Sequence, residues 1–489
     1  MKVACQGTPK LSIKCWYSID FQSYTKDNQP MRLFIISITM VFVAGTVCAQ
    51  TVQEDRRVEE AKRDYIKKIA PKQYIINERL YIDWGGWINY RFSDYEDSDN
   101  DSASKDTLEN SSDIDTRLWG QLAWIPDGWE DQQTIYVRLK NAFNYNTGGP
   151  GIEKHDHDGP HLDYGYGSFK YKSLKAEVGR RYFNIGRGIA YSNVHDGVQL
   201  NYGIPGWNIG LLSARTLPHE DNIDFSVPGN DKDTERLFYG LGIGYGGFRG
   251  HTLYGYALVQ RDESDPSPPD GQVYKYDSEY LGLGAMGDFG EGYSYWLETI
   301  KQTGTSHVFG SNLKSEIDAY ALNVGLSKEW GAQFEPSLTI EYGFGTGDAD
   351  RDDVTDTSSG NTTGQDENFL YFGYVPTGVA LAPRLSNLHL YRVGFDVRPL
   401  TKFKYTEDLY MGVEYFLYRK HRATGAISDL NATVSDRDIG YEWDFYLDWQ
   451  VMPDINLYFE YGYFVPGDAY AASADDPEKY FSVSLTKSF

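Results

Sequence analysis

The stretch YEWDFYLDW, residues 441–449, alternates between two kinds of side chain at every position. Its odd-numbered positions hold Tyr, Trp, Phe, Leu and Trp, whereas the even-numbered positions hold three carboxylates and a tyrosine. A face with three carboxylates would be costly in the apolar core of a β-sandwich, but it costs little where it lines water. The pattern therefore predicts a strand with one face toward lipid and the other toward a wet lumen.

The same period of two recurs along the chain. The segment TIYVRLKNAF (134–143) places aliphatic side chains on one face, whereas Tyr136, Arg138 and Lys140 lie on the other; LTIEYGF (338–344) repeats the pattern. Such alternation indicates half-buried strands. Eighteen strands are predicted, an even number as in single-chain bacterial barrels. The candidate strands are 79–93, 114–125, 134–145, 162–171, 175–183, 197–203, 207–216, 236–245, 249–260, 278–289, 293–302, 317–328, 335–346, 386–398, 408–419, 439–450, 456–465 and 480–489.

The connections between these segments are alternately short and long. Short ones such as 172–173 and 204–206 carry turn residues, and long ones such as 94–113 and 217–235 are mostly polar. Strict alternation of short periplasmic turns and long outer loops is typical of an outer-membrane barrel, whereas a soluble array of β-sandwiches gives no reason for it. We therefore predict an all-β protein, a single transmembrane antiparallel β-barrel of about 18 strands.

The composition agrees with this class. Aromatic residues make up 15% of the chain, and Tyr and Trp suit a membrane interface. The mean hydropathy of −0.53 is too polar for a helical membrane protein, but a barrel presents only alternate residues to lipid. The formal net charge is −24. Because no basic stripe is present to neutralise phosphates, we expect no nucleic-acid partner.

One segment predicts export. The sequence MRLFIISITMVFVAGTVCAQ (31–50) has an Arg, then an apolar run, then Val47-Cys48-Ala49 as a cleavage site before Gln50. It is too short to span a bilayer and is typical of a signal peptide. Met31 is interpreted as the start of translation, with an unusually long charged n-region as the alternative. The three cysteines all precede the cleavage point, so the mature chain needs no disulfide.

The predicted organisation has three parts. Residues 1–49 are an upstream extension with the signal peptide at 31–49, residues 50–73 are a periplasmic segment, and residues 74–489 are the barrel. The final strand, YFSVSLTKSF, places Phe489 on its apolar face. This is the kind of C-terminal signal that the barrel-assembly machinery reads, so we expect that machinery and outer-membrane lipid as partners.

The longest connection, 347–385, is the best candidate for a plug. It begins GDADRDD and later carries the apolar run FLYFGYVPTGVALAP (369–383). An apolar segment of that length is unfavourable in water. We expect it to pack into the barrel mouth or the lumen; a lipid-facing extension of the flanking strands is the alternative.

Several segments together resemble one known family. They are DIDTRLWGQLAW (113–124), AEVGRRYFNIGRGIAYSNVHDGVQLNY (176–202), LAPRLSNLHLYRVGFDV (381–397), RDIGYEWDFYLDW (437–449) and YFEYGYFVPGDAY (458–470). In order and spacing they are similar to the alginate export porins, and the resemblance covers most of 75–489. It implies a monomeric eighteen-stranded barrel through which an anionic polysaccharide leaves the periplasm. It also implies a lumen narrowed by loops and lined with arginines that attract uronate carboxylates.

The resemblance assigns lumen residues one by one. Arg117 is similar to a pore arginine of the family, and its position in the alternating pattern also places it on the inner face of its strand. The GRR segment offers Arg180 or Arg181, and strand alternation favours Arg181. Asp196 falls near a lumen aspartate of the family. Arg can bind a carboxylate through two parallel hydrogen bonds, which suits uronate. Further pore candidates are Arg138, Lys140 and Arg392.

The chain also departs from the family. Where the family has arginines before FxPGDAY, this chain has Tyr458 and Glu460, and its long loop is less basic. Such a pore suits a less acidic polymer, with aromatic lumen residues such as Tyr136 and Trp119 stacking on sugar faces. For each pore arginine, an ion pair that braces the wall is the alternative role.

Enzymatic and metal sites find little support. The cluster HDHDGPH (155–161) is predicted to lie in an outer loop, where its residues are polar side chains exposed to solvent rather than metal ligands. Asp348, Asp350 and Asp352 begin like a calcium loop, but Asp353 stands where Gly belongs and no Glu closes the loop. No nucleophile elbow or zinc motif is present. We therefore expect no enzyme activity, no cofactor and no metal.

The sequence favours a channel in the cell outer membrane. We expect a monomer that passes an anionic polysaccharide, alginate or a related exopolysaccharide, by guided passive diffusion, with periplasmic secretion components as partners. An uptake porin for small solutes or oligosaccharides is the alternative within the transport class. A barrel hydrolase is the weaker alternative outside it.

Overall fold

The computed structural model describes residues 72–98, 100, 109–148, 152–217, 235–248, 250–264, 275–308, 311–355, 361–401 and 406–489. All of them belong to one unit, Thr51–Phe489. The predicted signal peptide and most of the predicted periplasmic segment, through residue 71, lie outside the described residues. Within the described ranges no helix is long and apolar enough to cross a membrane.

Nineteen strands form a single sheet. They are β1 (Lys72–Asn77), β2 (Leu80–Glu96), β3 (Asn110–Trp124), β4 (Gln133–Gly148), β5 (Ile152–Tyr171), β6 (Leu174–Ile185), β7 (Tyr191–Ile204), β8 (Trp207–Arg215), β9 (Arg236–Phe248), β10 (His251–Asp262), β11 (Asp277–Gly290), β12 (Tyr293–His307), β13 (Lys314–Glu329), β14 (Ser337–Gly345), β15 (Leu388–Val397), β16 (Leu409–Lys420), β17 (Asp438–Met452), β18 (Ile455–Pro466) and β19 (Glu478–Ser488).

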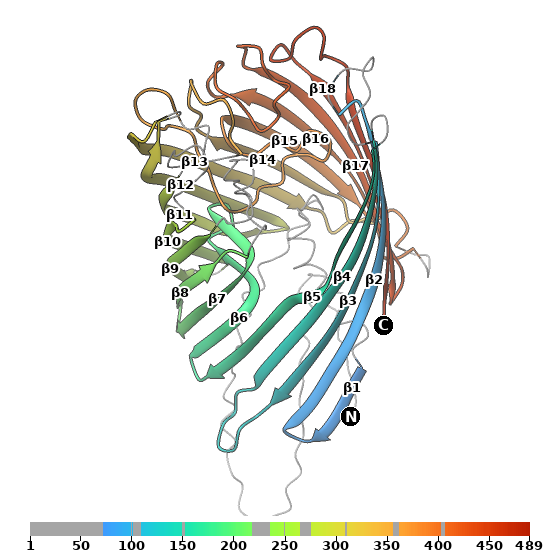
Figure 1. The fold of residues 1–489 in the computed structure, drawn as a ribbon. Helices are drawn as coiled ribbons and strands as arrows, with labels where there is room; N and C mark the ends of the chain where they lie inside the picture. The colour runs from blue at the N-terminus through green and yellow to red at the C-terminus, as the bar shows by residue number, and fades with distance from the viewer. Residues whose placement is uncertain are drawn as a thin grey trace, which may run out of the picture. The chain divides into compact units, whose positions relative to one another are not determined.

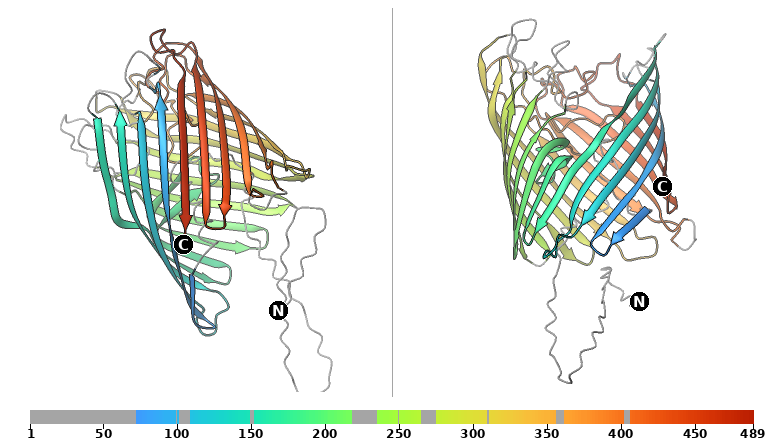
Figure 2. Two further views of the ribbon diagram at one scale, coloured as in Figure 1. Left: turned by 90° about the vertical axis from the view of Figure 1, so that its right-hand side faces the viewer. Right: turned by 60° about the horizontal axis from the view of Figure 1, so that its bottom comes forward.

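The sheet closes into a barrel. From β2 onward each strand pairs antiparallel with its neighbours in the chain, and β19 pairs with β2. Figure 2 shows the C-terminal strand beside the blue N-terminal one. β1 adds no further position to the ring, because it pairs with the part of β2 below the end of β19. The nineteen strands less β1 therefore form a closed antiparallel barrel of eighteen, which confirms the predicted fold class.

The alternation read from the sequence separates the two faces of the wall. In β4, Ile135, Val137 and Leu139 are exposed on the outer face, whereas Tyr136 and Arg138 are fully buried on the inner face. β17 behaves in the same way, with its odd-numbered aromatic residues outside and its carboxylates inside. An outer face that is apolar at alternate positions is what lipid requires.

Several elements differ from the sequence prediction, and the largest differences are at β1 and β5; β7 also begins earlier, at Tyr191, and β12 ends later, at His307. β1 was not predicted, because a short run beside a charged segment gives little periodic signal. β5 begins at Ile152 rather than at 162, so most of the predicted loop 146–161 is strand. The β4–β5 hairpin is consequently taller than its sequence indicates, since its polar residues still pair in register with β4.

The β6–β7 hairpin leaves the wall at its outer end. β5 pairs with β6 only as far as Gly165 and Arg180, and β7 pairs with β8 only as far as Asp196 and Arg215. Beyond these points the hairpin tip turns into the barrel, as Figure 1 shows. Its tip residues are buried there, and the turn uses Gly186 and Gly188 at positive φ.

We predict that the closed ladder survives mild detergent. Each of the eighteen strands pairs with a neighbour on both sides over at least part of its length, so the fold opens only when the ladder of hydrogen bonds is broken around the barrel. The unboiled protein should therefore migrate faster than the boiled protein on a detergent gel, while a water-soluble protein of similar mass should show no such difference. Identical migration of the two samples would contradict a closed barrel.

Candidate functional site

The inner face of β3–β5 holds a buried ion-pair network. Arg117 donates to Asp115 through Nε and Nη2, at 2.6 and 2.7 Å, and also contacts Asp163. Asp163 lies at a bulge in β5, where the register with β4 shifts, and Arg138 contacts the same carboxylate. Arg138 also stacks over Tyr164, 3.9 Å from the ring centroid. Removing one member of such a network leaves a buried charge without its partner.

Two other predicted pore cations are more accessible. The side chains of Lys140 and Arg181 are 21% and 22% exposed. Lys140 Nζ lies 2.8 Å from Asp158, and Arg181 pairs with Glu177 on its own strand while facing the rings of Tyr166 and Phe183. Each carries a cation on the inner face that water reaches. These two cations are better placed than Arg117 or Arg138 to meet a solute.

Arg180 and Asp196 form a pair on the other side of the wall. They are cross-strand neighbours, and Arg180 Nε and Nη2 donate to the Asp196 carboxylate at 2.9 and 3.0 Å. They share their face with Val178 and Val198, which are exposed apolar residues of the outer surface. The lumen position that the resemblance implies for Asp196 is therefore wrong, because the register places it one residue out of phase with the inner face. Arg180 also donates to the carbonyl of Leu162, at the point where β5 and β6 separate.

Arg392 lies in a second buried network, on the inner face of β14–β16. Its Nη1 donates to Glu341 at 2.8 Å and its Nη2 to Glu414 at 2.9 Å. Asp396 is on the same face and accepts from Ser337 at 3.0 Å. The arginine is 3% exposed. It is enclosed by carboxylates, which fits a wall brace as well as a pore cation.

The two inner walls differ in charge. β3–β6 carry interspersed cations and carboxylates, whereas β14–β18 are predominantly acidic, with Arg392 and Lys420 as their inward cations within the described part of the chain. The inward carboxylates of β14–β18 are Glu341, Asp396, Glu414, Glu442, Asp444, Asp448 and Glu460. Parts of the wall that differ in charge produce a field within the lumen.

The segment between β14 and β15 fills the outer part of the lumen. Phe369, Leu370 and Phe372 are no more than 1% exposed and belong to one apolar cluster with residues of the surrounding wall. Tyr280 donates to the carbonyl of Leu370 at 2.7 Å. Fully burying side chains of this size is worth about 1.5–3 kcal/mol each. The expected inward packing of 347–385 is confirmed for its described residues, and we call Thr346–Asn387 the plug segment.

The inward hairpin tip and the plug segment hold each other. Phe372 N donates to the carbonyl of Ala190 at 3.0 Å, Ser192 N donates to Phe372 O at 3.2 Å, and Tyr374 N donates to Gly188 O at 3.0 Å. Tyr191 and Phe372 form a parallel bridge. Sequence reasoning missed this arrangement. The signal it left was the stretch IGRGIAY (185–191), whose two glycines flank an arginine and which does not alternate as a wall strand does.

Two wall carboxylates accept backbone hydrogen bonds from these inward segments. Glu442 on β17 accepts from Val379 N and Ala380 N, both at 2.7 Å, and from Leu381 N at 3.1 Å. Tyr418 donates to Oε2 at 2.9 Å, the oxygen that also accepts from Leu381 N. A carboxylate that meets three successive N–H groups is held by charge-assisted bonds, which are stronger than neutral ones.

Glu298 on β12 does the same for the hairpin tip. It accepts from Arg187 N at 2.8 Å, from Tyr254 Oη at 2.6 Å and from Tyr256 Oη at 2.8 Å. Gln302 lies on the same inner face of β12 and accepts a hydrogen bond from Leu370 N at 3.1 Å. The inward segments are therefore fixed to β12 on one wall and to β17 on another.

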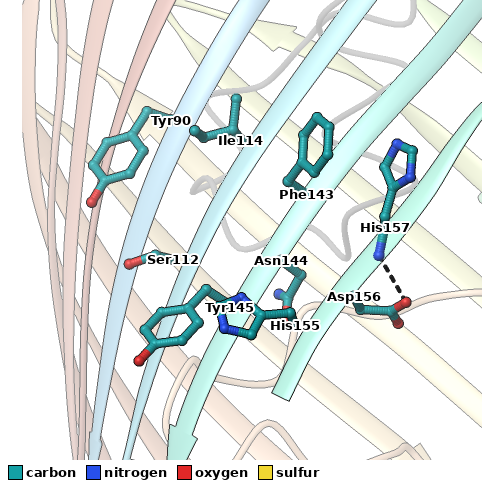
Figure 3. Close-up of a pocket in the computed structure, with 9 residues that line it drawn as sticks. All are labelled: Tyr90, Ser112, Ile114, Phe143, Asn144, Tyr145, His155, Asp156 and His157. Atoms are coloured by element: carbon teal, nitrogen blue, oxygen red, sulfur yellow. Dashed lines mark hydrogen bonds between the residues drawn. The ribbon is translucent and has the colours of Figure 1, made fainter. Parts of the chain in front are cut away.

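The histidine cluster is part of β5, not of an outer loop, so that prediction was wrong. His157 stacks on Phe143 with ring centroids 4.4 Å apart, and His155 packs on Tyr145. They line a pocket of about 270 Å³ (Figure 3). Phe143 is half exposed on the outer face of β4, so the pocket faces away from the lumen. Among the described residues no group of histidines, cysteines and carboxylates could hold a metal ion.

The aspartates at the start of the plug segment organise its backbone. Asp350 accepts from the backbone N–H groups of Thr362 and Thr363 at 3.1 and 2.9 Å, and Asp348 accepts from Glu367 N at 3.0 Å. Burial and the neighbouring Asp350 raise the pKa of Asp348 to about 6. Their oxygens are thus engaged in turns rather than arranged around a cation.

Comparisons with known proteins agree with this fold. A sequence profile of the family described as alginate export matches residues 81–484. Similar crystal structures include Pseudomonas aeruginosa OccK8 (OprE), at 10% identity and a TM-score of 0.52 over 83% of this chain and 98% of that one. OccK5 (OpdH) of the same organism has 11% identity and a TM-score of 0.50 over 84% and 99%. At these identities the likeness shows the fold alone. No curated protein matches the chain.

Removing the plug segment should open the lumen. Gly345 and Leu388 are direct partners in the β14–β15 ladder, so deletion of 350–383 leaves a short turn between strands that are already adjacent. We expect a higher single-channel conductance in planar bilayers, because the apolar cluster across the lumen is lost. A conductance equal to that of the intact chain, from protein that is still heat-modifiable on gels, would contradict the plug.

Glu442→Gln should loosen the plug without removing it. Glutamine keeps one acceptor but turns an amide toward the backbone N–H groups of 379–381, so charge-assisted bonds worth about 1.5–3 kcal/mol are weakened. We expect the open fraction in single-channel records to rise about tenfold. Asp396→Asn is the matched control, because Asp396 is also a buried wall carboxylate but contacts Ser337 and Tyr446 instead. Equal effects of the two variants would argue against Glu442 as a plug contact.

Proposed function

The chain belongs to the alginate export family, and we propose that it is the passive outer-membrane conduit for an anionic polysaccharide, alginate or a related uronate polymer. The observation that carries the proposal is the family match over 81–484, joined to a closed porin-like barrel. Transport through such a barrel needs a lumen that recognises the polymer weakly enough to release it. In this proposal, assembly depends on the barrel-insertion machinery, and periplasmic secretion components deliver the polymer.

The β3–β5 wall and the neighbouring β6 support recognition of a uronate. Lys140 and Arg181 present cations that are partly exposed on the inner face, and Tyr166 lies beside Arg181. A sugar carboxylate would bind these cations, and its ring faces would stack on the aromatic side chains. Arg117 and Arg138 are buried on the same inner face, where their contacts with Asp163 hold β5 at its bulge.

The plug segment sets the second requirement of the proposal. Its apolar cluster occupies the outer part of the lumen in this conformation. A polymer can therefore leave only when the plug segment and the hairpin tip shift away from Glu442 and Glu298. The carboxylates of a uronate polymer are acceptors of the same kind as Glu442, so they would compete for the N–H groups that hold the plug in place.

Ion selectivity tests the proposal. In the plug-deleted channel, the double variant Lys140→Gln/Arg181→Gln should lose most of its anion preference. Each charge in a narrow pore contributes on the order of 1 kcal/mol, because screening there is weaker than on an open surface. Zero-current potentials across a KCl gradient report the preference. Arg261→Gln is the control, since this arginine lies on the outer face and pairs with Glu279.

Two results would count against an anionic substrate. A cation-selective parent channel would mean that the acidic wall of β14–β18 dominates the lumen, which favours uptake of neutral or cationic solutes. An anion-selective channel that the double variant leaves unchanged would move recognition away from β4 and β6.

A further inference from the structure

The outer face of β14–β17 changes in character from the middle of the wall toward the loop end. One cross-strand row consists of Ile340, Val393, Tyr415 and Trp443. The next row toward the loops consists of Tyr342, Tyr391, Leu417 and Tyr441. The first row mixes aliphatic with aromatic residues and three of the four residues of the second are tyrosines, and enrichment in tyrosine marks the passage from the hydrocarbon to the headgroup level of a bilayer.

The row above the tyrosines is basic, and its positive charge resides on arginine. Phe344, His389 and Arg419 are cross-strand neighbours, and His389 stacks on Phe344 with ring centroids 4.8 Å apart. His421 packs edge-on against the same phenylalanine at 5.2 Å and lies 5.5 Å from His389. Arg437, the residue that precedes β17, is also part of this group. Its carbonyl accepts a hydrogen bond from Lys420 N at 2.8 Å. We call His389, Arg419, His421 and Arg437 the cationic patch.

Both arginines of the patch are exposed, and neither takes part in an ion pair within the described part of the chain. Asp438 is the cross-strand partner of Arg419, but no guanidinium nitrogen of Arg419 lies within 4.0 Å of a carboxylate oxygen of Asp438. The nearby Glu367 is already bound to Arg422. In a chain with a net charge of −24, two adjacent arginines without carboxylate partners need a physical reason.

The other cations near the loop end of the outer face make the contrast clear. Most of them have a carboxylate partner on the same face, and Lys314 is an exception among the described residues. The pairs are Arg180–Asp196, Arg215–Glu235, Arg261–Glu279, Lys301–Asp318 and Lys479–Glu96. Most cations at the headgroup level are thus balanced singly by a carboxylate of the protein, whereas the cationic patch brings two arginines together without such a pair.

We propose that the cationic patch binds a phosphate group of a phosphorylated lipid in the outer leaflet. Arginine forks bind phosphate oxygens through paired hydrogen bonds, and the histidines add donors at the same level. The rows below fit the rest of such a molecule: the tyrosines meet its polar linkage and the aliphatic residues meet its acyl chains. A free phosphate ion would use only the top row, whereas a lipid uses all three.

Native mass spectrometry of the full-length protein in detergent tests this proposal. The probes are lipid A with its phosphates and lipid A from which the phosphates have been removed. For Arg419→Gln/Arg437→Gln we expect binding of the phosphorylated lipid to weaken about tenfold or more, because charge-assisted hydrogen bonds are lost. The matched control Arg215→Gln/Arg261→Gln removes the same charge from paired positions of the outer face and should change binding little.

Three outcomes would overturn the proposal. Equal weakening in both double variants would mean that only net charge matters. Equal binding of the two lipids would mean that acyl contacts, not phosphate, hold the lipid. Displacement of the lipid by inorganic phosphate at similar concentrations would assign the patch to the free ion. Heat-modifiability on gels confirms that each variant is folded, and an unaltered conductance separates this site from the lumen.

Discussion

The structure depends on one constraint, that every backbone N–H and C=O group at membrane depth must find its partner within the protein. A closed antiparallel ladder satisfies it, and the pairing of β19 with β2 completes the ring. Closure fixes the register of each strand, and register fixes which side chains meet. The contact of Arg117 and Arg138 with the same aspartate, and the Arg180–Asp196 pair outside the wall, follow from that register. The lumen chemistry is thus a consequence of how the ring closes.

The constraint also explains what could be read from the sequence. Lipid requires an apolar residue at alternate positions of a strand, so the strands of the ring show a local period of two in the sequence. The same period predicts that Arg117 and Arg181 lie on the inner face. The rest depends on contacts between distant segments. Asp163 reaches Arg117 only because β5 bulges beside β4. The height of the β4–β5 hairpin and the inward turn of β6–β7 are set by pairing partners, not by local pattern. Asp196 was misplaced for the same reason, since a resemblance offset by one residue reverses the face.

The interior combines a packed apolar core with buried carboxylates, two features that normally exclude each other. The outer half of the lumen is a packed apolar core of the sort found in water-soluble proteins, while the wall around it holds buried carboxylates. The two are compatible because the carboxylates accept hydrogen bonds from the core's own backbone. Glu442 and Glu298 satisfy N–H groups that a loop in an apolar setting would otherwise leave without partners. An irregular segment can therefore lie inside a barrel without violating the rule that governs its wall.

The attachment of one segment to two walls has a mechanical meaning. Between Leu370, held by Gln302 on β12, and Leu381, held by Glu442 on β17, the chain acts as a strut across the barrel. A wide barrel resists flattening only weakly by itself, because its strands can slide and tilt together. With the strut in place, flattening must stretch or compress hydrogen bonds at both ends. A change in the cross-section of the barrel is therefore opposed by the same hydrogen bonds that hold the plug segment inside it.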